Sequence, residues 1–162
     1  MKSKKILFMT QAAMIAAIYV VLTLIFQAIS FGEIQVRIAE ALTILPAFTP
    51  AAIPGLFIGC LIGNIIGGSI LPDIILGSFA TLIGAFFTYL LRKQHKFLAP
   101  LPPIIANVTI IPFVLRYAYG LDLPIPFMML TVGIGEIISC GVLGLILYAP
   151  LQKHRNRIFK TM

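Results

Sequence analysis

Carboxylate, guanidinium and amide side chains interrupt the apolar segments of this sequence at a few positions. The candidate binding residues are Gln35, Arg37, Glu40, Asn64, Asp73, Asn107 and Glu136. Side chains of these types form ion pairs and charge-assisted hydrogen bonds, which are stronger than neutral ones. The chemistry that they predict is therefore the binding of a polar small molecule.

Gln35, Arg37 and Glu40 open an otherwise apolar segment in a chain with few charges. Residues three apart share one face of a helix, so Arg37 and Glu40 can present a cation and a carboxylate together to a third group. The same spacing also fits a simple salt bridge between the two at a membrane boundary. This segment alone leaves both interpretations open.

The composition is that of an integral membrane protein. Of the 162 residues, 60% are hydrophobic and only 10% are charged, and the mean hydropathy is +1.06. A soluble domain of this length would not stay in solution with such a composition. We therefore predict an all-α bundle of six transmembrane helices in a single domain, residues 1–162. The expected spans are residues 6–29, 38–48, 53–67, 72–91, 101–119 and 127–149.

The basic residues define the expected topology. All of the 12 lysines and arginines except Arg37 and Arg116 fall before the first span, after the fourth or after the sixth, in groups without acidic residues. By the positive-inside rule these groups, and both termini, face the cytoplasm. Residues 38–67 must then make two passes or a re-entrant pair. The net charge of +7 thus reflects topology and not nucleic-acid binding.

The first apolar run, residues 6–29, exceeds the roughly 7 to 15 residues of a signal-peptide core, so we interpret it as a retained helix. It carries two overlapping pairs of small residues, Ala12 with Ala16 and Ala13 with Ala17. Such pairs let another helix approach closely in lipid. Packing inside the protein is the simpler interpretation of the pairs themselves.

The third span has glycines at every fourth position, which form a groove for a neighbouring helix. They are Gly55, Gly59, Gly63 and Gly67. Beside them, Asn64 could cap a broken helix, bridge helices or contact a ligand, and these alternatives stay open. Asp73 lies in the first turn of the fourth span, where a capping role is favoured.

Glu136 follows Phe127 by nine residues, which is about 13 Å along a helix and near the middle of a bilayer core about 30 Å thick. An ionisable residue at that depth usually marks a pathway or a binding site. Most of the polar residues, Arg116 included, map to the half of the bundle away from the basic groups, whereas Asn107 maps to the other half. The asymmetry favours a pocket that opens to the exterior.

No catalytic, cofactor or metal site is expected. The sequence lacks a P-loop, and Cys60 and Cys140 stand alone in apolar helices, which favours packing over metal binding or a disulfide. His95 and His154 lie in basic segments, where solvation is expected. No internal repeat of the kind found in secondary transporters is visible. These features favour a substrate-capture subunit that depends on another protein for energy.

Five segments carry a more specific pattern. They are SFGEIQVRIAEALTILP, AAIPGLFIGCLIGNIIGG, LPDIILGSFATLIGAFFTYLLRK, LAPLPPIIANVTIIPFVLRYAYG and VGIGEIISCGVLGLILYAPL. In these segments, and above all in QVRIAEA and GIGE, the chain resembles the QueT family of queuosine-precursor transporters over nearly its whole length. Members of that family are substrate-specific S components of energy-coupling factor (ECF) transporters.

The resemblance implies a protein of the cell membrane, in contact with lipid, that binds substrate from outside. It also implies two kinds of partner, a transmembrane T component and two cytoplasmic ATPases. In the family's fold, alanine pairs on the first helix form the docking face for the T component. On that analogy Ala12, Ala13, Ala16 and Ala17 are expected partner contacts.

The implied substrates are queuine or its 7-deazaguanine precursors, whose guanine-like edge has N–H and NH2 donors beside a carbonyl acceptor. Our hypothesis is that Glu136 or Glu40 accepts the two donors, which would discriminate between bases by about 1 to 3 kcal/mol. The amide expected to meet the carbonyl and ring nitrogens is that of Asn107, Asn64 or Gln35. Asp73 could meet an aminomethyl cation, and Arg37 is expected to orient Glu40.

Two alternatives remain at this stage. One is an S component for another vitamin or nucleobase, which identification of the bound ligand would distinguish. The other is a self-standing small-solute channel or a small membrane enzyme. Co-purification with a T component and ATPases would argue against both members of that second class.

Overall fold

The computed structural model describes residues 2–30 and 36–159, and every regular element within these ranges is a helix. The main α-helices are α1 (Lys2–Ile25), α3 (Ala52–Ile66), α4 (Leu71–Leu91), α5 (Leu101–Tyr117), α6 (Ile125–Glu136) and α7 (Gly144–Lys153). The shorter elements are α2 (Gln27–Ser30), the 3-10 helices η1 (Ile38–Ala47) and η2 (Lys96–Leu98), the π-helix η3 (Ile137–Leu143) and α8 (Arg155–Ile158). The predicted all-α class is confirmed.

Four stretches of the described chain are long and apolar enough to cross a membrane. They are Lys4–Ile25, Leu71–Leu91, Lys96–Tyr117 and Ile125–Lys153. The surface is also apolar, with Phe79, Phe86 and Phe87 exposed along α4, as lipid contact requires. The chain is therefore an all-helical membrane protein. That the chain crosses the membrane six times, and that both termini are cytoplasmic, remain predictions.

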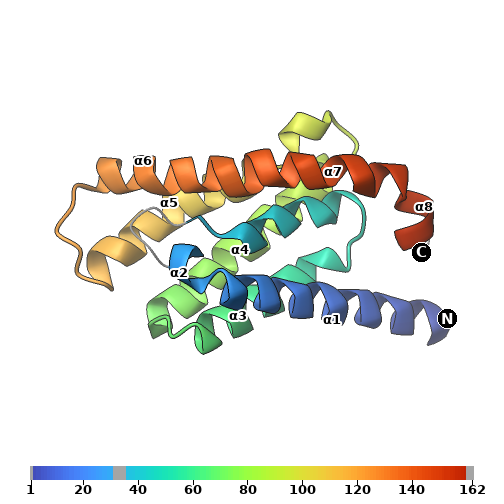
Figure 1. Cartoon of the computed structure of the whole chain (residues 1–162), viewed down its shortest axis with the longest axis horizontal. Helices are drawn as coiled ribbons and strands as arrows, with labels where there is room; N and C mark the ends of the chain where they lie inside the picture. The colour runs from blue at the N-terminus through green and yellow to red at the C-terminus, as the bar shows by residue number, and fades with distance from the viewer. Residues whose placement is uncertain (1, 31–35, 160–162) are drawn as a thin grey trace.

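The elements α1, η1, α3, α4 and α5 alternate in direction, whereas α6, η3 and α7 continue in one line, and the two termini lie at the same end of the molecule (Figure 1). In particular, η1 and α3 run antiparallel to each other between α1 and α4 in the chain. This arrangement fits the expectation that residues 38–67 double back. The turn at 67–70 and the segment 118–124 lie at the end opposite the termini.

The centre of the bundle is η1, which contacts α1, α3, α4, η3 and α7. All its residues from Ala39 to Ala47 are buried, so it has no solvent face. A 3-10 helix rises about 2.0 Å per residue, and the ten residues of η1 therefore extend only about 20 Å, less than a bilayer core of about 30 Å. The sequence predicts a helix that already includes Arg37, but Arg37 is extended (φ −89°, ψ 97°) and precedes η1.

Helices α1 and α3 touch through the glycine stripe that the sequence predicts. A Cβ on Gly59 would lie 2.8 Å from the Tyr19 Cβ and 3.1 Å from the Ala16 Cα, and a Cβ on Gly55 would lie 2.8 Å from the Ala12 carbonyl oxygen. A side chain at Gly55 or Gly59 would therefore push the two backbones apart. The groove is confirmed, and α1 fills it.

We predict that Gly59→Ala destabilises the protein by about 1 to 3 kcal/mol, because the added methyl group overpacks the contact with Tyr19. The matched control is Gly133→Ala in α6, where the new Cβ would meet only the Val108 Cγ2, at an ordinary 3.5 Å. Alanine is the better helix former, so the control should be neutral or stabilising. Thermal unfolding of the two variants in detergent measures the difference, and equal melting temperatures would contradict the assigned contact.

Candidate binding site

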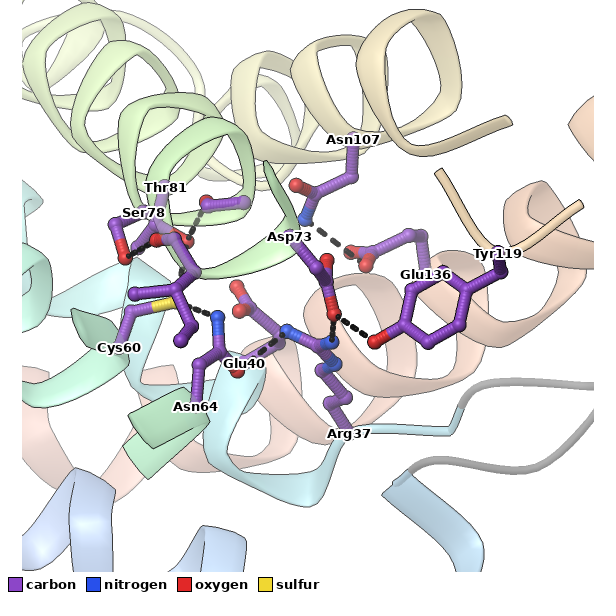
Figure 2. Close-up of polar contacts among 12 residues, drawn as sticks. Arg37, Glu40, Cys60, Asn64, Asp73, Ser78, Thr81, Asn107, Tyr119 and Glu136 are labelled. Carbon is purple, nitrogen blue, oxygen red and sulfur yellow. Dashed lines mark hydrogen bonds and ion pairs between the residues drawn. The ribbon is translucent and has the colours of Figure 1, made fainter. Parts of the chain in front are cut away.

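Six of the predicted binding residues gather in one buried polar cluster (Figure 2). They are Arg37, Glu40, Asn64, Asp73, Asn107 and Glu136, each at most 7% exposed. They come from the start of η1, from α3, α4 and α5, and from the end of α6. Gln35, the seventh, lies outside the described residues. Because burying an unpaired polar group is costly, the partners of each side chain are informative.

Glu136 is held by two neighbours. The Asn107 amide Nδ2 donates to Glu136 Oε1 at 2.9 Å, and the Cys140 thiol lies 3.1 Å from Glu136 Oε2. Glu136 is the last residue of α6, where the helix widens into the π-helix η3. Such π segments are frequent at functional sites. The contact with Asn107 ties α5 to α6 and joins a carboxylate to an amide.

Glu40 lies in the first turn of η1 and is buried, with 1% of its surface exposed. The Tyr19 hydroxyl on α1 donates a hydrogen bond to Glu40 Oε1. Glu40 Oε2 has no hydrogen-bond partner within the described ranges. Donor atoms of Glu40, Glu136 and Cys140 all lie within 4.8 Å of one another. These are atom types that a metal ion can accept, although each of the three side chains already has another partner.

Asp73 does not cap α4. It lies in the first turn as predicted, but the N-cap is Ile70 and no side-chain cap hydrogen bond forms. Its carboxylate turns into the bundle instead, where Oδ2 accepts the Tyr119 hydroxyl at 3.0 Å and pairs with Arg37 Nη2 at 3.7 Å. The capping interpretation is wrong because a buried guanidinium offers this carboxylate a stronger partner than the helix end does.

Arg37 lies between two elements. Its Nη1 donates to Asn64 Oδ1 on α3 at 3.4 Å, and its Nη2 faces Asp73 on α4 (Figure 2). Asn64 therefore links α3 to the extended residue that precedes η1, which is closest to the bridging role among the three left open for it. The idea that Arg37 and Glu40 present one helical face does not hold, because the backbone of Arg37 is extended. The alternative was a salt bridge between Arg37 and Glu40 at a membrane boundary. The ion pair seen in the described part of the chain instead joins Arg37 to Asp73, and both side chains are buried.

The sequence reasoning missed two tyrosines and undervalued two cysteines. The Tyr119 hydroxyl reaches Asp73, and the Tyr19 hydroxyl reaches Glu40. Cys60 and Cys140, interpreted as packing residues, also form polar contacts, with the Asn64 Nδ2 3.6 Å from the Cys60 sulfur. A tyrosine hydroxyl buried in a helix needs a partner. That rule could have flagged Tyr19 beforehand.

Other expected positions lie away from the cluster. Arg116 forms an exposed ion pair with Asp122 at 2.9 Å, in which the Asp122 side chain is 98% exposed. Arg116 therefore does not join the polar residues with which it was grouped.

The four alanines on α1 divide into two pairs. Ala16 is buried against Gly59 and Ala12 is half-buried against Gly55, whereas Ala13 and Ala17 are exposed. The first pair therefore packs within the protein, as the simpler interpretation holds. Only the second pair presents small residues on the surface.

The cluster offers mainly hydrogen-bond acceptors from carboxylates, together with amide donors, in an apolar surround. Its chemistry is that of holding a polar ligand in place.

Comparison with known protein families gives a match: the family model of the QueT transporter matches residues 9–153. No curated protein and no solved structure matches the chain. The family match covers nearly the whole chain and confirms the resemblance drawn from the sequence. The chain belongs to the QueT transporter family.

Proposed function

We propose that this chain is the substrate-binding S component of an ECF importer, and that it captures queuine or another 7-deazaguanine precursor of queuosine from outside the cell. The observation that carries the proposal is the buried cluster of carboxylates and amides in an otherwise apolar bundle. Ionisable groups in such a place are expensive and usually functional. Membership in the QueT transporter family supports the choice of substrate class.

Glu136 and Asn107 are the best candidates for reading the base edge. Their side chains already touch, with the Asn107 Nδ2 2.9 Å from Glu136 Oε1. A carboxylate beside an amide N–H complements an edge that has two donors beside a carbonyl. On substrate binding the carboxylate accepts the ring N–H and the amino group, while the amide donates to the carbonyl.

Asp73 has a different task in this proposal. Its carboxylate is already engaged by Arg37 and by the Tyr119 hydroxyl. We therefore assign Asp73 and Arg37 to holding α4, the start of η1 and the segment 118–124 together around the site. An aminomethyl cation on the substrate would find this carboxylate already paired.

The energy for uptake comes, in this proposal, from a T component and two cytoplasmic ATPases. Ala13 and Ala17 give α1 an exposed pair of small residues spaced by four. Small residues of that spacing permit close helix contact in lipid. They are the proposed docking points for the T component, with Ala12 and Ala16 supporting α1 from the inside.

We predict that Glu136→Gln weakens binding of 7-deazaguanine about 10-fold or more, because it removes the carboxylate acceptor from the base edge. Dissociation constants of purified protein in detergent, measured by calorimetry, test this. The matched control is Asp122→Asn, which neutralises an exposed carboxylate away from the cluster. If Glu136→Gln and Glu40→Gln both bind as tightly as the parent, the carboxylate-edge assignment is wrong.

A second prediction concerns the partner. The double variant Ala13→Leu with Ala17→Leu should lose co-purification with the T component and ATPases and should lose uptake, while it still binds 7-deazaguanine, because the bulk lies on an exposed face. Ala149→Leu, an equally small and exposed position on α7, serves as control. Full uptake by the double variant, or uptake in cells without the ATPases, would refute the docking proposal.

A further inference from the structure

One buried carboxylate oxygen in the cluster is left without a hydrogen bond. Glu40 is 1% exposed, its Oε1 accepts the Tyr19 hydroxyl, and its Oε2 has no such partner in the described part of the chain. The Thr81 hydroxyl lies within hydrogen-bonding reach of Glu40, but its single hydrogen is donated to the Gly77 carbonyl oxygen at 3.1 Å. Leaving a buried acceptor unsatisfied is costly, and more so if it is charged. A ligand that supplies a donor at this point removes that penalty.

The position of Glu40 relative to Glu136 restricts the kind of donor. Oxygen atoms of the two carboxylates lie within 4.8 Å of each other. Charge-assisted N–H···O bonds are about 2.8 Å long, so a single nitrogen between the two oxygens can reach both. That nitrogen must carry two hydrogens that point in different directions. A planar amino group meets this requirement, whereas a hydroxyl or a ring N–H has only one hydrogen to give.

We propose that Glu40 is a specificity-determining residue, which accepts the second hydrogen of the exocyclic amino group while Glu136 accepts the first. The ligand class is then an amino-bearing base of guanine type, and its deamino counterpart of hypoxanthine type is rejected. This inference rests on the proposed function and deepens it. It gives each of the two carboxylates a separate task.

Tyr19 is the positioning residue in this arrangement. It is 1% exposed on α1, and its Cβ packs against the bare backbone of Gly59. Its hydroxyl donates to Glu40 Oε1, and Oε2 is the oxygen without a hydrogen-bond partner among the described residues. Without that hydroxyl the carboxylate can rotate, and the alignment with the amino group is lost.

The test compares dissociation constants for 7-deazaguanine and 7-deazahypoxanthine, which differ by the amino group alone. The parent protein should prefer 7-deazaguanine by about 10- to 100-fold, because the deamino base leaves Glu40 unsatisfied. Glu40→Gln should reduce the preference to about threefold or less, mostly by weakening 7-deazaguanine. Glu136→Gln should weaken both bases. Thermal unfolding without ligand reports whether each variant is folded.

Tyr19→Phe provides a second variant that keeps the carboxylate and the core volume. It should lower the preference several-fold, and it should have no further effect when combined with Glu40→Gln. The control is Thr23→Val, which removes another buried hydroxyl from α1, one that bonds the Tyr19 carbonyl oxygen at 2.9 Å. This control should leave the preference unchanged.

The outcomes separate the inference from the function. If the parent binds both bases and the preference survives in Glu40→Gln and in Tyr19→Phe, Glu40 does not read the amino group, and the proposed function stands. If the folded parent binds neither base, the proposed function fails and the inference fails with it. A preference lost in both variants and kept in Thr23→Val supports the proposal.

Discussion

The close contact of α1 with α3 at Gly59 determines where the polar cluster can form. Because Gly59 has no side chain, the two helix backbones can approach closely. A Cβ at Gly59 would lie only 2.8 Å from the Tyr19 Cβ, which is too close. The Tyr19 hydroxyl then reaches Glu40 at the start of η1. A wider spacing between α1 and α3 would move the Tyr19 hydroxyl away from Glu40, and the hydrogen bond to Oε1 would be lost. The apolar packing of two helices thus sets the hydrogen bonding of a carboxylate on a third element.

The cluster in turn connects elements that the apolar core alone would leave weakly specified. Arg37 joins the start of η1 to α3 and α4, and the Asn107–Glu136 bond joins α5 to α6. Apolar side chains gain no hydrophobic free energy by leaving lipid for one another, because lipid tails are as apolar as leucine. Hydrogen bonds and ion pairs among buried polar groups are directional, so they fix the relative register of the helices, which apolar surfaces alone do not. For this protein the same bonds build the site and orient the helices around it.

The sequence predicted the features that depend on local pattern. Hydropathy indicates the long helices, the four-residue glycine spacing indicates the α1–α3 groove, and scarcity of charge singles out Glu40, Asp73 and Glu136. Features that depend on which side chains meet in space were missed. Asp73 has a position suited to capping, but its partner Arg37 lies 36 positions away in the chain. No spacing rule connects such residues, nor does one show that residues 38–47 wind as a 3-10 helix.

The balance of donors and acceptors limits what such a site can hold. Its described members include three buried carboxylates, Glu40, Asp73 and Glu136, and one guanidinium. The segment 31–35, FGEIQ, contains no lysine or arginine that could add a positive charge. The Arg37 guanidinium pairs with Asp73 and also attracts Glu40 and Glu136, whose carboxylates lie within 4.8 Å of each other. Two carboxylates at that separation repel each other unless hydrogens lie between them. A ligand that brings N–H groups to this side of the site, as a guanine-like edge does, relieves that repulsion, whereas an acceptor-rich edge adds lone pairs to it.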